Sequence, residues 1–82
     1  MALDLKKPLG MRLSKYLKSH IKLRGMTYAE LAEAMKKYGQ DENEASIANK
    51  FSRSAFSAEF FVAALLALGV QHADLSYFEG DY

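Results

Sequence analysis

Residues 26–57, MTYAELAEAMKKYGQDENEASIANKFSRSAFS, decide how the rest of the chain is interpreted. They predict two short helices joined by a polar turn. Thr27 and Glu30 have the spacing of a capping box, in which each side chain bonds the backbone N–H of the other residue. Gly39 suits the left-handed position that ends the first helix, and Asn43 suits the cap of the second. Two consecutive helices of this size are typical of a helix-turn-helix.

Apolar residues within the two helices recur at the spacing that turns one face of a helix inward. Met26 and Leu31 also occupy the staple positions on either side of the first cap. The inward residues that we expect in the core are Leu31, Ala32, Met35, Tyr38, Ile47 and Phe51.

A longer helix is expected before the pair, from Pro8 in its first turn to about Arg24, with Gly25 just past its end. Its residues separate into an apolar arc and a basic arc. The apolar arc holds Leu9, Leu13, Tyr16, Leu17 and Ile21, and the basic arc holds Arg12, Lys15, Lys18 and Lys22. His20 lies on the apolar arc, where we expect it to be partly buried and hydrogen-bonded. The other histidine, His72, is far along the chain, so we expect no metal site.

A fourth helix is expected from its cap Ser57 to Gly69, with Phe56 and Phe61 at the staple positions. Glu59 is almost its only polar residue, so two sides of this helix need cover. The face that we expect to lie outside the core holds Val62, Ala63, Leu66 and Ala67. Either a second subunit covers this face in a homodimer, or the C-terminal segment 75–78 folds back over it. That segment is expected to form a short helix opened by Gln71 or His72, or a short strand.

Three groups of residues carry a resemblance to a known class. Thr27-x3-Leu31-Ala32, Asn43-x3-Ile47 and the polar segment 52–54 resemble the DNA-binding domain of the lambda repressor and Cro class. Ile47 lies fifteen positions after Ala32, further than the matching positions lie apart in that class. LKxxxKxRGMTYAELAE followed by EASIANKFSRSAFSAEFF is similar to a family of short bacterial proteins that share a domain of unknown function.

The fold that follows from these patterns is all-α, a four- to five-helix bundle with a lambda-repressor-like helix-turn-helix. We expect a single domain over residues 1–82, with an ordered core at about residues 8–78.

The repressor resemblance implies a DNA interface on the second helix of the pair, whose first turns face the major groove in that class. The residues that would face the bases are Glu44, Ala45, Ser46 and Asn49. Lys50 and Arg53 would lie near the DNA backbone, and Tyr28 matches a position that meets a phosphate. The carboxylates of Asp41, Glu42 and Glu44 oppose an anionic duplex, although they also favour a helix N-terminus.

Charge is distributed unevenly along the chain. Residues 1–26 carry seven basic side chains against one acidic, a net charge of +6, whereas residues 27–82 carry four basic and nine acidic, a net charge of −5. A block of one sign can attract an anionic partner even when the total charge is small. The basic arc of Lys15, Lys18 and Lys22 is therefore a second candidate contact with DNA, a contact with RNA, or simply a solvated helix face.

Several classes of protein are disfavoured. The chain has no cysteine, no phosphate-binding glycine loop and no recognisable nucleophile motif, so we expect neither an enzyme nor a cofactor. The apolar run 60–70 is too short to span a membrane, and the first residues lack the apolar region of a signal peptide. We expect a cytoplasmic regulator of transcription that binds double-stranded DNA as a homodimer. The alternative is a protein-interaction or oligomerisation module on the same fold.

Overall fold

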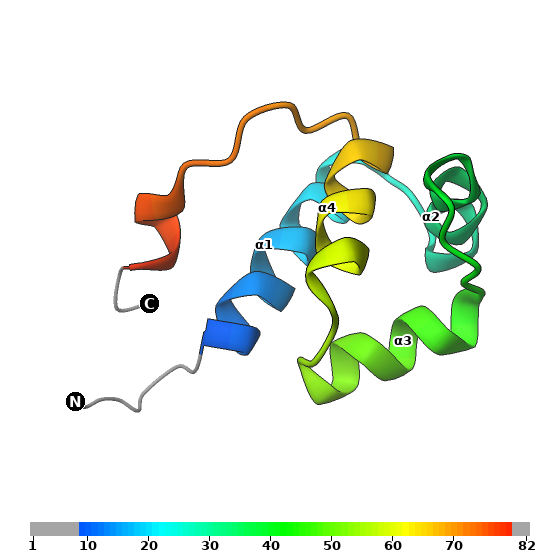
Figure 1. Ribbon diagram of the computed structural model, residues 1–82, viewed down its shortest axis with the longest axis horizontal. Helices are drawn as coiled ribbons and strands as arrows, with labels where there is room; N and C mark the ends of the chain where they lie inside the picture. The colour runs from blue at the N-terminus through cyan, green and yellow to red at the C-terminus, as the bar shows by residue number, and fades with distance from the viewer. Residues whose placement is uncertain (1–8, 80–82) are drawn as a thin grey trace.

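The computed structural model describes residues 9–79, and over those residues it contains helices and no strand (Figure 1). Its α-helices are α1 (Leu9–Arg24), α2 (Tyr28–Met35), α3 (Glu44–Arg53) and α4 (Ala58–Ala67). Two short 3-10 helices, η2 (Lys36–Tyr38) and η3 (Leu75–Phe78), follow α2 and α4. The expected all-α class is confirmed. The expected place of Pro8 in the first turn, and the start of the ordered core at residue 8, lie outside the described residues.

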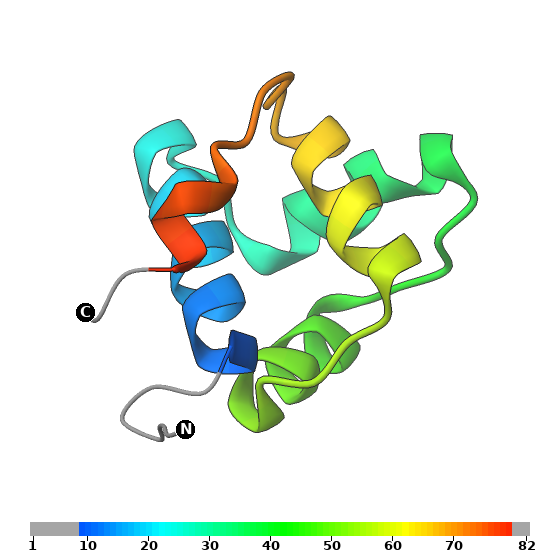
Figure 2. The same ribbon diagram turned by 60° about the vertical axis from the view of Figure 1, so that its left-hand side comes forward.

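The core lies between the four α-helices. Helix α2 packs against both α3 and α4, and η3 packs against α1 (Figures 1 and 2). Each α-helix supplies at least one side chain that is almost completely buried. These side chains, together with that of the residue after α4, are Leu17, Leu31, Met35, Ile47, Phe60 and Leu68. Burying an apolar side chain of this size stabilises a fold by about 1.5–3 kcal/mol relative to leaving it in water.

Local hydrogen bonds fix where α2 begins and ends. The N–H of Thr27 donates to Glu30 Oε1 at 2.9 Å, and the N–H of Glu30 donates to Thr27 Oγ1 at 3.1 Å, which confirms the capping box. The last turn of the expected helix is the 3-10 helix η2, and Gly39 ends it with a φ of +78°. Tyr38, expected in the core, lies at its edge with 36% of its surface exposed.

The starts of α3 and α4 also follow the expected caps. Asn43 Oδ1 accepts from the N–H of Ser46 at 2.8 Å, and Ser57 Oγ accepts from the N–H of Phe60 at 3.0 Å. The rings of Phe56 and Phe61 stack beside the second of these caps, with centroids 6.2 Å apart and an interplanar angle of 3°. The expected staple positions around Ser57 are therefore in contact.

The N-terminal half of α1 differs from the expected pattern. Leu9, placed on the apolar arc, is 56% exposed, whereas Ser14 is buried. The reason is that the C-terminal end of α3 packs here: Gly10 faces the Ser54 carbonyl, and Ser14 Oγ donates to Ser54 Oγ at 3.4 Å. This side of α1 therefore needs small and polar residues, and Leu9 lies beyond the core.

His20 is half-buried, as expected, but it makes an aromatic contact rather than the expected hydrogen bond. Its ring lies edge-on to that of Tyr16, with centroids 4.7 Å apart. Among residues 9–79 no hydrogen bond of the His20 ring is present, and no group of three or more His, Cys, Asp or Glu residues is placed to hold a metal ion.

The C-terminal segment packs on α1 and not on the outer face of α4. Phe78 is buried against Tyr16, with ring centroids 5.1 Å apart, and lies 6.3 Å from the ring of Phe61. The expected short helix is η3, but Asp74 caps it, not Gln71 or His72. The alternative in which this segment covers α4 is therefore wrong.

Candidate nucleic-acid interface

The outward face of α3 is built by simple helical spacing. Ile47 and Phe51 turn into the core, and the opposite side of the helix carries Ala45, Asn49 and Arg53, each one turn after the other. All three are exposed. Among the described residues, no hydrogen bond or ion pair engages the side chain of Asn49 or of Arg53. Their polar groups are thus available to a ligand.

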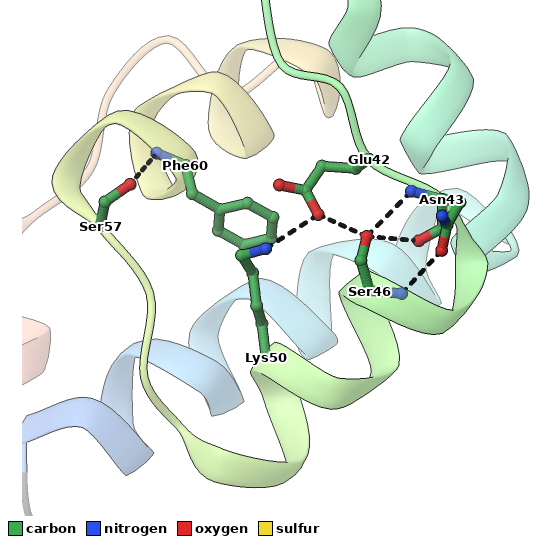
Figure 3. Close-up of polar contacts among 6 residues, drawn as sticks. All are labelled: Glu42, Asn43, Ser46, Lys50, Ser57 and Phe60. Carbon is green, nitrogen blue, oxygen red and sulfur yellow. Dashed lines mark hydrogen bonds and ion pairs between the residues drawn. The ribbon is translucent and has the colours of Figure 1, made fainter.

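Two other expected contact residues on α3 are engaged within the chain (Figure 3). The hydroxyl of Ser46 accepts from the N–H of Asn43 at 2.9 Å and donates to Glu42 Oε1 at 2.6 Å. Lys50 Nζ donates to the same Glu42 oxygen at 3.1 Å and lies 5.4 Å from the centroid of the Phe60 ring. Ser46 and Lys50 therefore stabilise the start of α3 and its packing on α4.

The same network changes the charge at the start of α3. The Glu42 side chain is only 8% exposed and forms an ion pair with Lys50, so its charge is compensated within the fold. Asp41 and Glu44 remain exposed, and neither takes part in an ion pair among the described residues. Two of the three carboxylates expected to repel a duplex thus face solvent.

Helix α1 brings basic side chains next to the α2–α3 pair. Lys18 Nζ lies 5.9 Å from the centroid of the Phe51 ring, and the ring of half-buried Tyr28 lies 5.3 Å from Phe51 on centroids. The start of α2, the middle of α1 and the inner side of α3 therefore meet around Phe51. Lys15 and Lys22, one turn before and after Lys18 on the same arc, are also exposed.

The two arginines of α1 bond backbone carbonyls at the C-terminal side of the fold. Arg12, expected on the basic arc, donates through Nη1 to the carbonyl of Phe78 in η3. Arg24 donates through Nη1 to the carbonyl of Leu68, just after α4. Carbonyls at helix ends lack intrahelical donors, and each guanidinium satisfies one of them. Arg12 shares the arc of the lysines, but its side chain bonds η3 within the fold, so we do not count it among the basic groups available to a ligand.

The face of α4 that was expected to lie outside the core is partly exposed. Val62 is 51% exposed and Leu66 44% exposed, and Ala67 is half-buried. The expectation that Ala63 belongs to the outer face is wrong, because its side chain is buried, with only 4% exposed. The helix is apolar on every side, so its composition does not distinguish the buried side from the exposed one.

None of the helices formed by residues 9–79 is long and apolar enough to cross a membrane.

Asp74, at the start of η3, is the cap of that short helix. The hydroxyl and the N–H of Ser76 bond the carboxylate of Asp74 and lower the pKa of that group. Asp74 lies outside the surface formed by α1 and α3.

Residues 9–79 thus form helices without a strand, with exposed polar side chains on α3 and exposed lysines on α1. Residues 10–73 match the model of the Domain of unknown function (DUF6471), so the chain belongs to this family. The expected membership of a family without assigned function is confirmed. No curated protein and no solved structure matches the chain.

Proposed function

We propose that this chain binds double-stranded DNA, with α2 and α3 acting as a helix-turn-helix like that of the lambda repressor and Cro class. The observation that supports this best is the outward face of α3, where Ala45, Asn49 and Arg53 are exposed and unengaged. A small transcriptional regulator is the role that we propose for such a module.

Each of these residues has a chemical role in the proposed complex. Asn49 is centred on the outward face and can form two hydrogen bonds with one adenine, while Ala45 can contact a thymine methyl group. Arg53 lies one turn after Asn49 and is exposed, so we assign its guanidinium to the DNA backbone. Ser46 and Lys50 are left out of the proposed contacts, because their polar groups already have partners.

The basic arc of α1 supplies the proposed electrostatic attraction. Lys15, Lys18 and Lys22 are exposed on one side of α1, and Lys18 reaches the aromatic cluster around Phe51 that also contains Tyr28. Phosphate contacts position a module on the duplex, and base contacts give it sequence preference. We assign the first task to the three lysines and Tyr28, and the second to α3.

The longer spacing between Ala32 and Ile47 is compatible with this proposal. The additional residues form η2 and the turn at 39–43, and α2 still packs directly on α3. The insertion therefore lengthens the connection and leaves the contact between the two helices in place. Exposed Asp41 and Glu44 lower the affinity that we expect, since they lie at the end of α3 nearest the bases.

Fluorescence polarisation with a random-sequence duplex, measured across a salt series, tests the proposal. The triple variant Lys15→Ala/Lys18→Ala/Lys22→Ala should weaken binding to every sequence and flatten the salt slope by roughly 0.9 per lost phosphate contact. Lys36→Ala is the matched control, because Lys36 is also exposed but pairs with Glu33 and lies on η2. Wild-type protein that fails to bind duplex at low salt contradicts the proposal.

Readout by α3 needs a separate measurement. Asn49→Ala should reduce the preference for one base pair by roughly 1–3 kcal/mol in a binding-site selection, and non-specific affinity should remain. Because Asn49 is exposed, this variant should fold normally. Equal or tighter binding to single-stranded RNA across the same salt series would instead assign the basic arc to RNA.

A protein-interaction module is the second candidate, and one observation favours it. Val62 and Leu66 expose apolar surface on α4, and no segment among the described residues covers them. Exposed apolar patches on small domains mark contacts with other proteins. This surface is separate from the outward face of α3, so the two functions are compatible.

A further inference from the structure

The exposed side of α4 borders a shallow apolar groove of about 450 Å³. Ala63 forms part of its buried floor, and Val62 and Leu66 stand at its edge. Tyr38 and Gln40, from η2 and the turn after it, form the opposite wall. Glu59, one turn before Val62 and Ala63, lies at the N-terminal end of α4 in the same groove.

A second hollow, of about 390 Å³, lies across the ridge formed by Leu66 and Tyr38, which line both. Its charged lining is mainly basic. Arg24 lies here, held against the Leu68 carbonyl, and Lys37 Nζ lies 5.7 Å from the centroid of the Tyr38 ring. Glu33 also lines this hollow, but its carboxylate is paired with Lys36 at 3.1 Å.

One face of the molecule therefore has an acidic end, an apolar middle and a basic end. The acidic end is Glu59, which has no ion pair among the described residues. The basic end lies beside Ala67, eight residues further along the chain. At about 1.5 Å per residue, the two ends are roughly 12 Å apart along α4, with Ala63 midway.

We propose that this face binds a second copy of the chain, with the two α4 helices packed antiparallel about a two-fold axis near Ala63. A two-fold interface brings the same patch of both copies together, so the patch has to complement itself. Rotation about Ala63 places Glu59 of one copy opposite Ala67 of the other, next to the basic hollow with Lys37. The Leu66 ridge of each copy then enters the apolar groove of the other, over the small side chain of Ala63.

Charge is the reason for assigning a second copy to this face. An unrelated apolar partner would have no need of opposite charges placed symmetrically about the middle of one helix. The C-terminal segment is already packed on α1, so it does not fill the groove. The inference is independent of the DNA-binding proposal, which concerns α3 and the lysines of α1.

Sedimentation velocity of the full chain over a concentration series tests the assembly. We expect a monomer–dimer equilibrium without larger species, because a two-fold contact closes on itself. Leu66→Glu should abolish the dimer, since a charge would be buried against apolar surface without a partner. Circular dichroism checks that this variant is folded. Wild-type protein that remains monomeric at high micromolar concentration overturns the proposal.

Charge reversal tests the antiparallel geometry and keeps the proposal falsifiable if Leu66→Glu does not fold. Glu59→Lys and Lys37→Glu each make both ion pairs of a homodimer repulsive, so each should raise the dimer Kd about tenfold at low salt. An equimolar mixture of the two variants restores both attractive pairs and should recover a wild-type Kd in a heterodimer.

The control and the salt dependence sharpen this test. Lys15→Glu reverses an exposed charge on α1, away from the groove, and should leave the dimer unchanged. The recovery in the mixture should diminish at high salt, because ions screen exposed pairs. A mixture that dimerises no better than either variant alone contradicts the antiparallel arrangement. Association only with a different protein would assign the groove to that partner instead.

Discussion

Replacing Lys50 with Met should destabilise the fold. Substitution of a partly exposed lysine usually has a small effect, but this lysine pairs with a buried carboxylate. The Lys50 side chain is 27% exposed, and its ammonium group compensates Glu42, which is only 8% exposed. Methionine keeps an unbranched apolar stem beside the Phe60 ring but leaves Glu42 with one remaining donor, the Ser46 hydroxyl. A buried carboxylate then loses its counter-ion.

The expected loss can be bounded from the geometry. Removing one partner of a fully buried ion pair costs about 3–5 kcal/mol. Here Lys50 is not fully buried and Glu42 keeps a hydrogen bond at 2.6 Å, so we expect a smaller loss of about 2 kcal/mol. For a domain of this size, about 2 kcal/mol corresponds to a fall in Tm of roughly 8–16 °C.

The chain contains a matched control for this variant. Lys36 and Glu33 form an ion pair with the same N–O distance of 3.1 Å, but their side chains are 55% and 76% exposed. Lys36→Met should therefore change stability by less than about 0.5 kcal/mol. Urea unfolding followed by circular dichroism measures both variants. If Lys50→Met and Lys36→Met lower the free energy of unfolding equally, the argument that burial makes the Glu42–Lys50 pair more stabilising is refuted.

Two further predictions concern other parts of the fold. Gly10→Ala should lower stability by about 1–3 kcal/mol in the same unfolding assay, despite the better helix propensity of alanine, because a Cβ at Gly10 would collide with the Ser54 carbonyl. Asp74 should hold η3 by its bonds to Ser76 at neutral pH. Since those bonds lower its pKa below the ordinary 3.8, this contribution is complete above pH 3.8 and is lost as the pH falls through the lower folded value. An NMR titration of the Ser76 amide should show a transition below pH 3.8 that is absent in Asp74→Ala, and a transition above that pH would contradict the prediction.

The parts of the fold that the sequence predicts correctly depend on short spacings. The caps join residues three positions apart: Thr27 bonds the N–H of Glu30, and Asn43 bonds the N–H of Ser46. These bonds therefore depend only on the first turn of each helix. Gly39 and Gly69 end their helices with positive φ, which only depends on the local backbone. Such features need no knowledge of which helices meet.

The features that the sequence did not predict depend on tertiary packing. Ser14 is buried, and Leu9 is not, because α3 ends against the first turns of α1. Arg12 has the spacing of the exposed lysines, yet it bonds a carbonyl in a segment 66 residues away. Helical spacing gives the direction of a side chain but not the neighbour that it meets.

The candidate site shows the same division. The outward direction of Asn49 follows from the inward direction of Ile47 and Phe51, which the apolar spacing indicates. The engagement of Lys50 does not follow, because its partner Glu42 lies before the helix and its side chain becomes buried only in the folded structure. Glu42, Ser46 and Lys50 are spaced four residues apart, which is compatible with mutual hydrogen bonds. The same spacing is equally typical of an exposed helix face, so it does not by itself indicate the bonds.

The proposed DNA-binding surface and the proposed dimer surface use different residues, so either proposal can be wrong while the other is right. If both are right, DNA binding and dimer formation are thermodynamically coupled. A two-fold dimer carries two α3 helices, and a duplex with two half-sites could bind both at once. DNA would then stabilise the dimer by the same factor by which dimer formation raises DNA affinity. Glu59→Lys and Lys37→Glu leave the outward face of α3 unchanged. DNA affinity lost in each variant and recovered in their mixture would therefore arise from assembly, and not from contacts made by these two residues with DNA.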